Sequence, residues 1–369
     1  MTALLIRPAA TPDLPRLLEL ENNSFSGDRL SRRSFRYFLQ QTHNCFLVAE
    51  QAGRVDAYVL ILLHRGTHLA RVYSLAVDPA QRGQGLAARL LDAAERQCAA
   101  DGRISMRLEV RKDNAAAISL YQRMGYYTFG EYADYYEDHA DALRLQKRIL
   151  HMDEQTTHLE VPYYAQNTEF TCGPAALMMG MAALRSGQDM STSEELRIWR
   201  EATTIYMMAG HGGCSPLGLA LAASRRGFAV RVYLSTLDTP FLDSVRGEKK
   251  KHIVTLVHAD YLAQLRQQAD SEIIYENLTQ DHLQAALEAG ELPLVLISTY
   301  RFDSKKMPHW VVVAAMDERF IYIHDPFIDE SEYRFALDNQ YLPVSRKDFD
   351  RMSQFGQSRL RAAVVLKAR

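Results

Sequence analysis

Cys172, in the stretch QNTEFTCGPAALMMG, is the residue of the second half of the chain whose type and position most suggest chemistry. The small and apolar residues after it predict a buried helix from Pro174 to Ser186, because proline is favoured in a first helical turn. A thiol beside a helix N-terminus experiences partial positive charge, which favours the reactive thiolate. Free cysteines are also common small core residues, so a catalytic and a structural interpretation are both open.

Three polar residues could complete a site for nucleophilic thiol chemistry, which needs a base, a group that orients it, and donors to an oxyanion. His309 opens the apolar strand HWVVVAAM, and Asp325 closes the next strand, FIYIHDP. The short turn MDERF makes these strands neighbours, so the two side chains could face each other at one end. Gln166, just before the cysteine, could direct its amide at an oxyanion. Each residue alone has an ordinary explanation, whereas the four together favour catalysis.

On the motifs QNTEFTCGPAAL, PHWVVV and HDP, residues 159–369 resemble the papain-like leader peptidases found at the front of bacteriocin exporters. His309 also lies within the interval of about 130–150 residues that papain-like enzymes leave after the cysteine. The resemblance implies that Cys172 is the nucleophile, His309 the base, Asp325 its orienting carboxylate and Gln166 the oxyanion donor. Unlike the exporters, this chain has no ATPase or membrane segment, so a Gly-Gly leader substrate is not implied.

Two other residues compete for these roles. Cys214, in AGHGGCSPLGLALAA, is a second thiol that could line the cleft together with His211. The Ser-Pro pair after it predicts a helix start, and no downstream histidine pairs with it as naturally, so we predict a structural role. His324 precedes Asp325 on the same strand, and the alternation of side chains directs it to the opposite face.

The first half carries a different signature, a glycine-rich turn between a strand and a helix in VYSLAVDPAQRGQGLAARLLDAAE. Small residues let backbone N–H groups converge there, and the helix N-terminus adds positive potential, an arrangement that suits a pyrophosphate. A short glycine loop by itself is weak evidence, since an ordinary turn has the same composition. The residues of this predicted cradle are Arg82, Gly83, Gln84, Gly85, Leu86 and Ala87.

A second motif, RLEVRKDNAAAISLYQRMGYYTFG, supplies groups for proton transfer. Glu109 lies on a predicted strand and could accept a proton from an amine, directly or through water. Asn114 begins a predicted helix, and Tyr121 follows about two turns later on the same face, where it could protonate a departing thiolate. The ordinary interpretations are an exposed glutamate, an N-cap asparagine and a core tyrosine.

Residues 4–149 resemble the GNAT acyltransferase superfamily, and within it the RimI-like protein N-terminal acetyltransferases, on the cradle and on LEVRKDNAAAISLYQRMGY. The resemblance implies acetyl-CoA as acyl donor, Glu109 as general base, Tyr121 as general acid and Asn114 as a cofactor contact. The backbone at the end of the preceding strand would hold the acetyl carbonyl, namely at Leu75, Ala76 and Val77. The RimI-like segment EYADYYEDHADALRL favours a peptide N-terminus as acceptor over a small amine.

The predicted elements that position these residues fall into two domains. Strands at 4–8, 45–51, 55–63, 69–77, 104–110 and 142–149 alternate with helices at 11–25, 30–41, 86–100 and 114–124, which predicts an α/β domain at 1–150 around a mixed sheet. The polar segment 151–160 is a predicted linker. From 161 to 369, helices at 174–186, 194–206 and 216–226 precede strands at 228–234, 292–299, 309–316, 320–326 and 362–368, which predicts an α+β, papain-like domain.

Composition excludes several classes of protein. A net charge of −2 gives no nucleic-acid footprint, and the run 248–251 (EKKK) fits a solvated loop. No apolar run is long enough for a membrane span, no signal peptide is visible, and four irregularly spaced cysteines predict a reducing, cytoplasmic compartment. No Walker, HExxH or CxxC motif indicates an ATP or metal site.

Together these features predict a bifunctional enzyme that acts on peptides or proteins, an N-acetyltransferase joined to a cysteine peptidase. Two alternatives stay open: a second domain that only binds peptides for the acetyltransferase, or one that acts as an amidase or transpeptidase. The acceptor amine, the cleavage specificity and the oligomeric state are not readable from the sequence.

Overall fold

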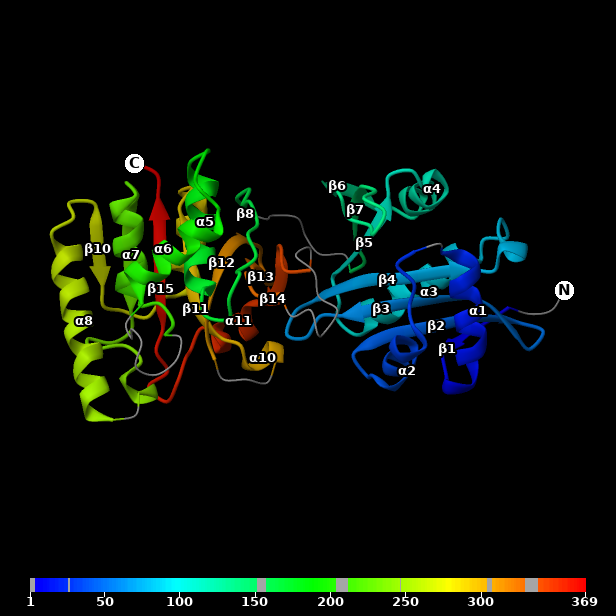
Figure 1. The fold of residues 1–369 in the computed structure, drawn as a ribbon, viewed down its shortest axis with the longest axis horizontal. Helices are drawn as coiled ribbons and strands as arrows, with labels where there is room; N and C mark the ends of the chain where they lie inside the picture. Colours follow the sequence, from blue (N-terminus) through cyan, green and yellow to red (C-terminus); the bar gives the residue numbers. More distant parts are fainter. Residues whose placement is uncertain are drawn as a thin grey trace. The chain divides into compact units, whose positions relative to one another are not determined.

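The computed structural model describes residues 4–25, 27–150, 157–203, 212–245, 247–303, 307–328 and 338–369. The chain divides into two compact units, Met1–Asp153 and Glu154–Arg369, each described by itself (Figure 1). Within the described ranges, no helix combines the length and the apolar character that crossing a bilayer needs.

In the described part of the first unit, seven strands form one mixed sheet in the order β1-β2-β3-β4-β5-β7-β6. Their bounds are Leu5–Pro8 (β1), Asn44–Gln51 (β2), Arg54–Leu63 (β3), Leu69–Val77 (β4), Ser105–Arg111 (β5), Tyr127–Tyr132 (β6) and Ala142–Arg148 (β7). The helices are Leu14–Ser24 (α1), Arg32–Gln40 (α2), Leu86–Ala100 (α3) and Ala115–Arg123 (α4), with 3₁₀ turns at Thr11–Asp13 (η1) and Pro79–Gln81 (η2).

Alternation along the strands gives this sheet two buried faces. Helix α3 packs on β2, β3 and β4 over a cluster that includes Cys45, Leu47 and Val59. Helices α1 and α2 contact strands of the same sheet, and Phe35 of α2 meets the Tyr58 ring edge-on at 5.6 Å. The predicted mixed-sheet α/β fold is confirmed for this unit. Strand β6 was not predicted, because its exposed, aromatic-rich sequence lacks regular alternation.

The second unit is built on an eight-stranded sheet among its described residues, ordered β10-β9-β15-β11-β12-β13-β14, with β8 paired to β12. The strands are Thr157–His158 (β8), Ala229–Leu234 (β9), Ser271–Ile274 (β10), Leu292–Ser298 (β11), Pro308–Met316 (β12), Phe320–His324 (β13), Leu342–Ser345 (β14) and Ala362–Lys367 (β15). The helices are Cys172–Leu184 (α5), Thr192–Ala202 (α6), Pro216–Arg225 (α7), Glu248–Arg266 (α8), Gln280–Glu288 (α9), Tyr300–Asp303 (α10) and Arg346–Met352 (α11), with a 3₁₀ turn at Leu242–Ser244 (η3).

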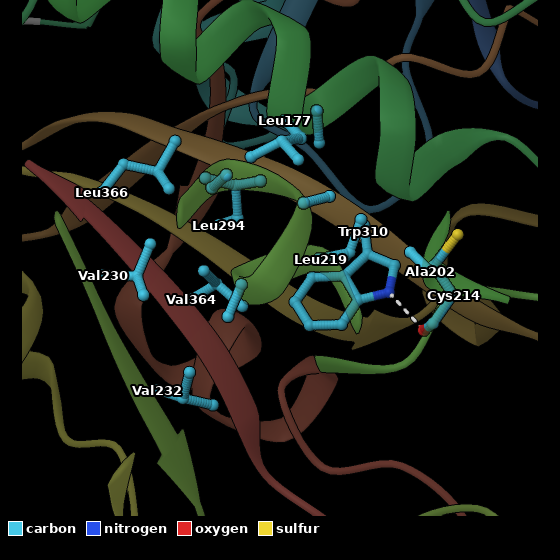
Figure 2. Close-up of a cluster of buried hydrophobic side chains, with 14 of the residues drawn as sticks. Leu177, Ala202, Cys214, Leu219, Val230, Val232, Leu294, Trp310, Val364 and Leu366 are labelled. Carbon is cyan, nitrogen blue, oxygen red and sulfur yellow. Dashed lines mark hydrogen bonds between the residues drawn. The ribbon is translucent and has the colours of Figure 1, made fainter. Parts of the chain in front are cut away.

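The core of this unit lies between α5, α7 and one face of the sheet. Figure 2 shows Leu177 of α5, Leu219 of α7 and Leu294 of β11 within it, beside the Trp310 indole. The indole Nε1–H donates to the Cys214 carbonyl at 3.3 Å (Figure 2), so the ring fills the core without an unpaired donor.

Three predictions for this unit need correction. Helix α5 begins at Cys172, two residues before Pro174, so the thiol lies inside the first turn. The run 248–251, predicted to be a loop, opens α8, where Lys251 pairs with Glu248 one turn away at 3.0 Å. Within the predicted linker, β8 pairs with the end of β12. The predicted helix at 194–206 corresponds to α6, and its last residues lie outside the described ranges.

Candidate active sites

Helix α5 places Cys172 at the start of a helix whose first ten residues are all buried. The Cys172 side chain is a free thiol with 6% exposure. The next residue must be small, because a Cβ at Gly173 would lie 3.1 Å from both the Cys214 Cβ and a methyl group of Leu219. The Cys-Gly-Pro sequence therefore brings a helix N-terminus, with its thiol, into a tightly packed interior.

Strands β12 and β13 bring His309 and Asp325 together, because the two strands are antiparallel and Val312 pairs with His324. The His309 Nε2 lies 2.6 Å from the Asp325 Oδ1, with both side chains almost fully buried. Oδ1 also accepts the backbone N–H of Phe327 at 2.9 Å, which fixes the carboxylate.

The electrostatic surroundings of His309 connect it to Cys172. Burial of the imidazole acts to lower its pKa, but the Asp325 carboxylate and the Cys172 sulfur, each through charge and a hydrogen bond, raise the pKa to about 10. Because Nε2 is taken by Asp325, Nδ1 is the ring atom left for the sulfur. An imidazolium held at neutral pH between a carboxylate and a thiol is the arrangement that supports a thiolate nucleophile.

Gln166 lies on the loop before Cys172, and both its side chain and its backbone are hydrogen-bonded. Its Nε2 donates to the Thr168 carbonyl at 2.7 Å, which uses one of two amide hydrogens and leaves one for an oxyanion. Its backbone N–H donates to the Pro326 carbonyl at 2.9 Å, directly after Asp325. The loop before the cysteine is thereby attached to the segment that carries the carboxylate.

The competing residues lie in structural environments. Cys214 is buried, and burial together with the charge of Cys172 raises its pKa, so it stays a neutral thiol beside Cys172. His324 is fully buried between the rings of Tyr163 and Tyr341, at 6.1 and 4.5 Å between centroids. His211 lies outside the described residues.

In the first unit, the predicted phosphate cradle is an exposed turn that leads into α3. Gly83 and Gly85 have φ of 79° and 77°, the left-handed region that favours glycine, and a Cβ on either would meet no atom within 4 Å. Gly85 is the N-cap of α3, so the first N–H groups of that helix are directed at the same open space. The residues here fit a pyrophosphate: Arg82 is exposed, and Leu86 is buried beneath the turn.

The strands beside the cradle separate where an acyl group would need room. Strands β4 and β5 pair in parallel only from Leu69–Ser105 to Arg71–Arg107. A bulge in β4 opposite Leu60–Ile61 of β3 accompanies this parting. Beyond it, Leu75, Ala76 and Val77 continue to pair with β3 but not with β5, and the Val77 carbonyl accepts from Arg82 Nε of the cradle at 3.4 Å.

Glu109 lies on β5 past this point and is held by a partner that the sequence analysis did not identify. Arg71 of β4 donates to the Glu109 Oε2 from Nε at 2.9 Å and from Nη2 at 2.6 Å, with both side chains buried. The same Nη2 donates to the Tyr135 hydroxyl at 3.1 Å. An arginine inside the apolar strand LARVYSLAV was the available signal, since buried arginines are normally paired.

Tyr121 is buried on α4, and burial together with the charge of Glu109 raises its pKa to about 12, so it remains protonated and able to donate. Burial and the charge of Glu109 also raise the pKa of Tyr136, which the sequence analysis did not name as a candidate. Asn114 is the exposed N-cap of α4, and its Oδ1 accepts from the Ala117 N–H at 3.1 Å. The predicted contact of Asn114 with the cofactor would therefore have to come from its Nδ2.

Among the described residues, no group of three or more His, Cys, Asp or Glu side chains is arranged to hold a metal ion.

Comparison with known families places each site in a domain of a known type. Residues 14–126 match the acetyltransferase (GNAT) family, whose members use acetyl-CoA, and residues 161–367 match the Peptidase_C39 like family. A curated relative, an uncharacterized protein of Mycobacterium leprae, is 35% identical over 136 residues. That match covers 36% of this chain and only 37% of the relative.

Solved structures similar to this chain are acetyltransferases that match about two fifths of its length. The ribosomal-protein-S18-alanine N-acetyltransferase from Escherichia coli is 27% identical and covers 42% of this chain and 98% of its own, with a TM-score of 0.38. Ard1 from Thermoplasma volcanium is 26% identical, covers 40% and 99%, and has a TM-score of 0.38. The protein yncA from Salmonella typhimurium, solved with its cofactor acetyl-CoA, is 22% identical, covers 42% and 98%, and has a TM-score of 0.37.

The resemblances to both families are confirmed, and with them the two-domain fold class. Because the second family model extends over more than half of the 369 residues, the chain belongs to the Peptidase_C39 like family and carries a GNAT acetyltransferase domain in its first half.

Proposed function

We propose that this protein is a bifunctional enzyme of peptides or proteins: an acetyl-CoA-dependent N-acetyltransferase joined to a cysteine peptidase. The observation that carries the peptidase half is the buried His309–Asp325 pair, 2.6 Å apart, with the Cys172 thiol beside the same imidazole. The end of the pairing between β4 and β5, next to an open cradle, supports the acetyltransferase half.

In the peptidase step, the Cys172 thiolate attacks a peptide carbonyl, and the carbonyl oxygen becomes an oxyanion that accepts a hydrogen bond from Gln166. His309 gives its proton to the leaving amine as the C–N bond breaks, which leaves an acyl-enzyme thioester. Water, deprotonated by His309, then cleaves the thioester and regenerates the thiol. Asp325 orients the ring and stabilises its charged form throughout.

In the acetyl-transfer step, acetyl-CoA would supply the acyl group, with its pyrophosphate at the 82–87 turn and its acetyl carbonyl at the backbone of residues 75–77. Glu109 takes the proton of the acceptor amine, and Tyr121 protonates the CoA thiolate that departs. A peptide or protein amine is the proposed acceptor, and a cytoplasmic setting suits the four free cysteines.

A peptide library incubated with the purified protein, with and without acetyl-CoA and read by mass spectrometry, tests both halves. We expect new peptide termini that Cys172→Ala abolishes, and acetylated amines that Cys172→Ala leaves intact. Acetylation without any cleavage would favour the alternative in which the second domain only binds peptides, and joined peptides would favour a transpeptidase.

A further inference from the structure

Glu195 is a fully buried carboxylate that neither proposed reaction uses. It lies in the first turn of α6 with an exposure of 0%. Burying a carboxylate is costly unless hydrogen bonds compensate, so its partners indicate what it is for. All the partners that we find among the described residues come from one short segment, the loop just before Cys172.

Three donors of this loop converge on the Glu195 carboxylate. The Asn167 backbone N–H donates to Oε1 at 2.9 Å, and the Asn167 side-chain Nδ2 donates to Oε2 at 2.6 Å. The Tyr164 hydroxyl donates to Oε2 at 2.9 Å and also accepts from Asn167 Nδ2 at 2.7 Å. Because all three donors belong to one short segment, together they fix this loop against α6.

The loop segment between these contacts carries Gln166. Tyr164 and Asn167 flank it, and its own N–H is bound to the Pro326 carbonyl on the other side, at 2.9 Å. We propose that Glu195 is a positioning residue of the peptidase site, which sets the place of the Gln166 amide relative to the Cys172 sulfur. This inference rests on the proposed function and adds to it a residue that its mechanism does not mention.

Two reagents separate this role from simple stabilisation of the fold. Acylation of Cys172 by p-nitrophenyl acetate passes through an oxyanion and needs the Gln166 donor. Alkylation by iodoacetamide needs the thiolate but forms no oxyanion. Glu195→Gln keeps the size of the side chain but replaces one acceptor oxygen with an amide donor, which cannot accept from the loop.

Glu194→Gln is a matched control, because Glu194 is also buried on α6 but binds Arg226 at 2.5 Å and Arg197, away from the loop. The rates are measured on full-length protein, and the rate of Cys172→Ala is subtracted as background. We expect Glu195→Gln to slow acylation about tenfold, which is less than the about 10²–10³-fold effect of removing an oxyanion donor altogether, because Gln166 is displaced and not lost. Alkylation should be unchanged, and Glu194→Gln should alter neither rate.

Tyr164→Phe keeps the ring and removes one of the three bonds, so it should give a smaller loss of acylation even if Glu195→Gln fails to fold. Unchanged acylation in these variants, an equal loss of acylation and alkylation, or the same loss in Glu194→Gln would each overturn the role of Glu195. If wild-type protein is acylated no faster than Cys172→Ala, the peptidase proposal fails, and this inference with it.

Discussion

The charge of Asp325 should account for most of the unusual proton affinity of His309, and Asp325→Asn tests this directly. In the wild type, Asp325 Oδ1 accepts hydrogen bonds from His309 Nε2 at 2.6 Å and from the Phe327 N–H. The substitution preserves the shape of the side chain and keeps an oxygen at this position. Only the negative charge is lost, while burial of the imidazole, which disfavours its charged form, stays.

The size of the effect follows from the separation of the two charges. At an effective dielectric constant of about 20, unit charges about 4 Å apart attract by about 4 kcal/mol. Since one pKa unit corresponds to about 1.36 kcal/mol, removal of the carboxylate charge should lower the pKa of His309 by about 3 units. The expected change is therefore from about 10 to about 7.

Nuclear magnetic resonance of protein labelled at its histidine rings measures this titration without any substrate. The chain has twelve histidines, and loss of one signal in His309→Gln assigns the relevant resonance. Cys172→Ala serves as the comparison, because the sulfur is a smaller cause of the raised pKa than the carboxylate. A wild-type midpoint near 6.5, or an Asp325→Asn midpoint that stays near 10, would refute the reasoning.

The same shift predicts how stability depends on pH. A histidine whose pKa is higher in the folded chain than the unfolded value of about 6.5 binds protons more tightly when folded. Its stabilisation is complete below pH 6.5 and is lost as the pH rises towards 10. The melting temperature of the second unit should therefore fall between pH 7 and 10 in wild-type protein, and much less over that interval in Asp325→Asn.

Three further predictions concern the other proposed groups. Acetyl-CoA should raise the melting temperature of the wild type but not of Gly85→Glu. Gly53→Glu, at a φ of 78° in another open turn, is the control for backbone strain alone and should keep the increase in melting temperature. Loss of that increase in Gly53→Glu would contradict the cradle. Tyr121→Phe should lower acetyl-transfer turnover by about 10²–10⁴-fold with acetyl-CoA affinity nearly intact, and wild-type turnover would reassign the tyrosine to packing. At mildly acidic pH, iodoacetamide should label Cys172 faster than the buried Cys214, as peptide mapping can check; equal rates would oppose the nucleophile assignment.

The sequence predicted the fold best where side-chain periodicity reports burial on its own. Strand β4 and helix α3 were predicted with the bounds that they have, since a pattern of apolar residues ends at a turn signal in each case. Helix α8 was missed because its first turn, EKKK, is charged and its apolar side chains follow no strong stripe. Its position against α7 and β10 comes from tertiary contacts that local sequence does not encode.

The candidate sites divide in the same way. Residues whose chemistry is unusual for their place in the chain, such as Cys172 and His309, could be selected from the sequence and are brought together by the fold. Glu195 could not be selected, because a glutamate in the first turn of a helix is an ordinary residue there. Its significance arises from complete burial against a loop about thirty residues earlier, which only the folded chain reveals.

In the acetyltransferase domain, the negative charge of Glu109 affects the proposed roles of two residues that the sequence analysis selected separately, Glu109 itself and Tyr121. Arg71 holds Glu109 through two N–H donors, and the negative charge of Glu109 adds to burial in raising the pKa of Tyr121 to about 12. Replacing Glu109 would remove the proposed base and would also make Tyr121 a stronger acid, because one cause of its raised pKa would be lost. A rate loss in Glu109→Gln would therefore combine both effects, whereas Tyr121→Phe leaves the Arg71–Glu109 pair in place and isolates the proton donor.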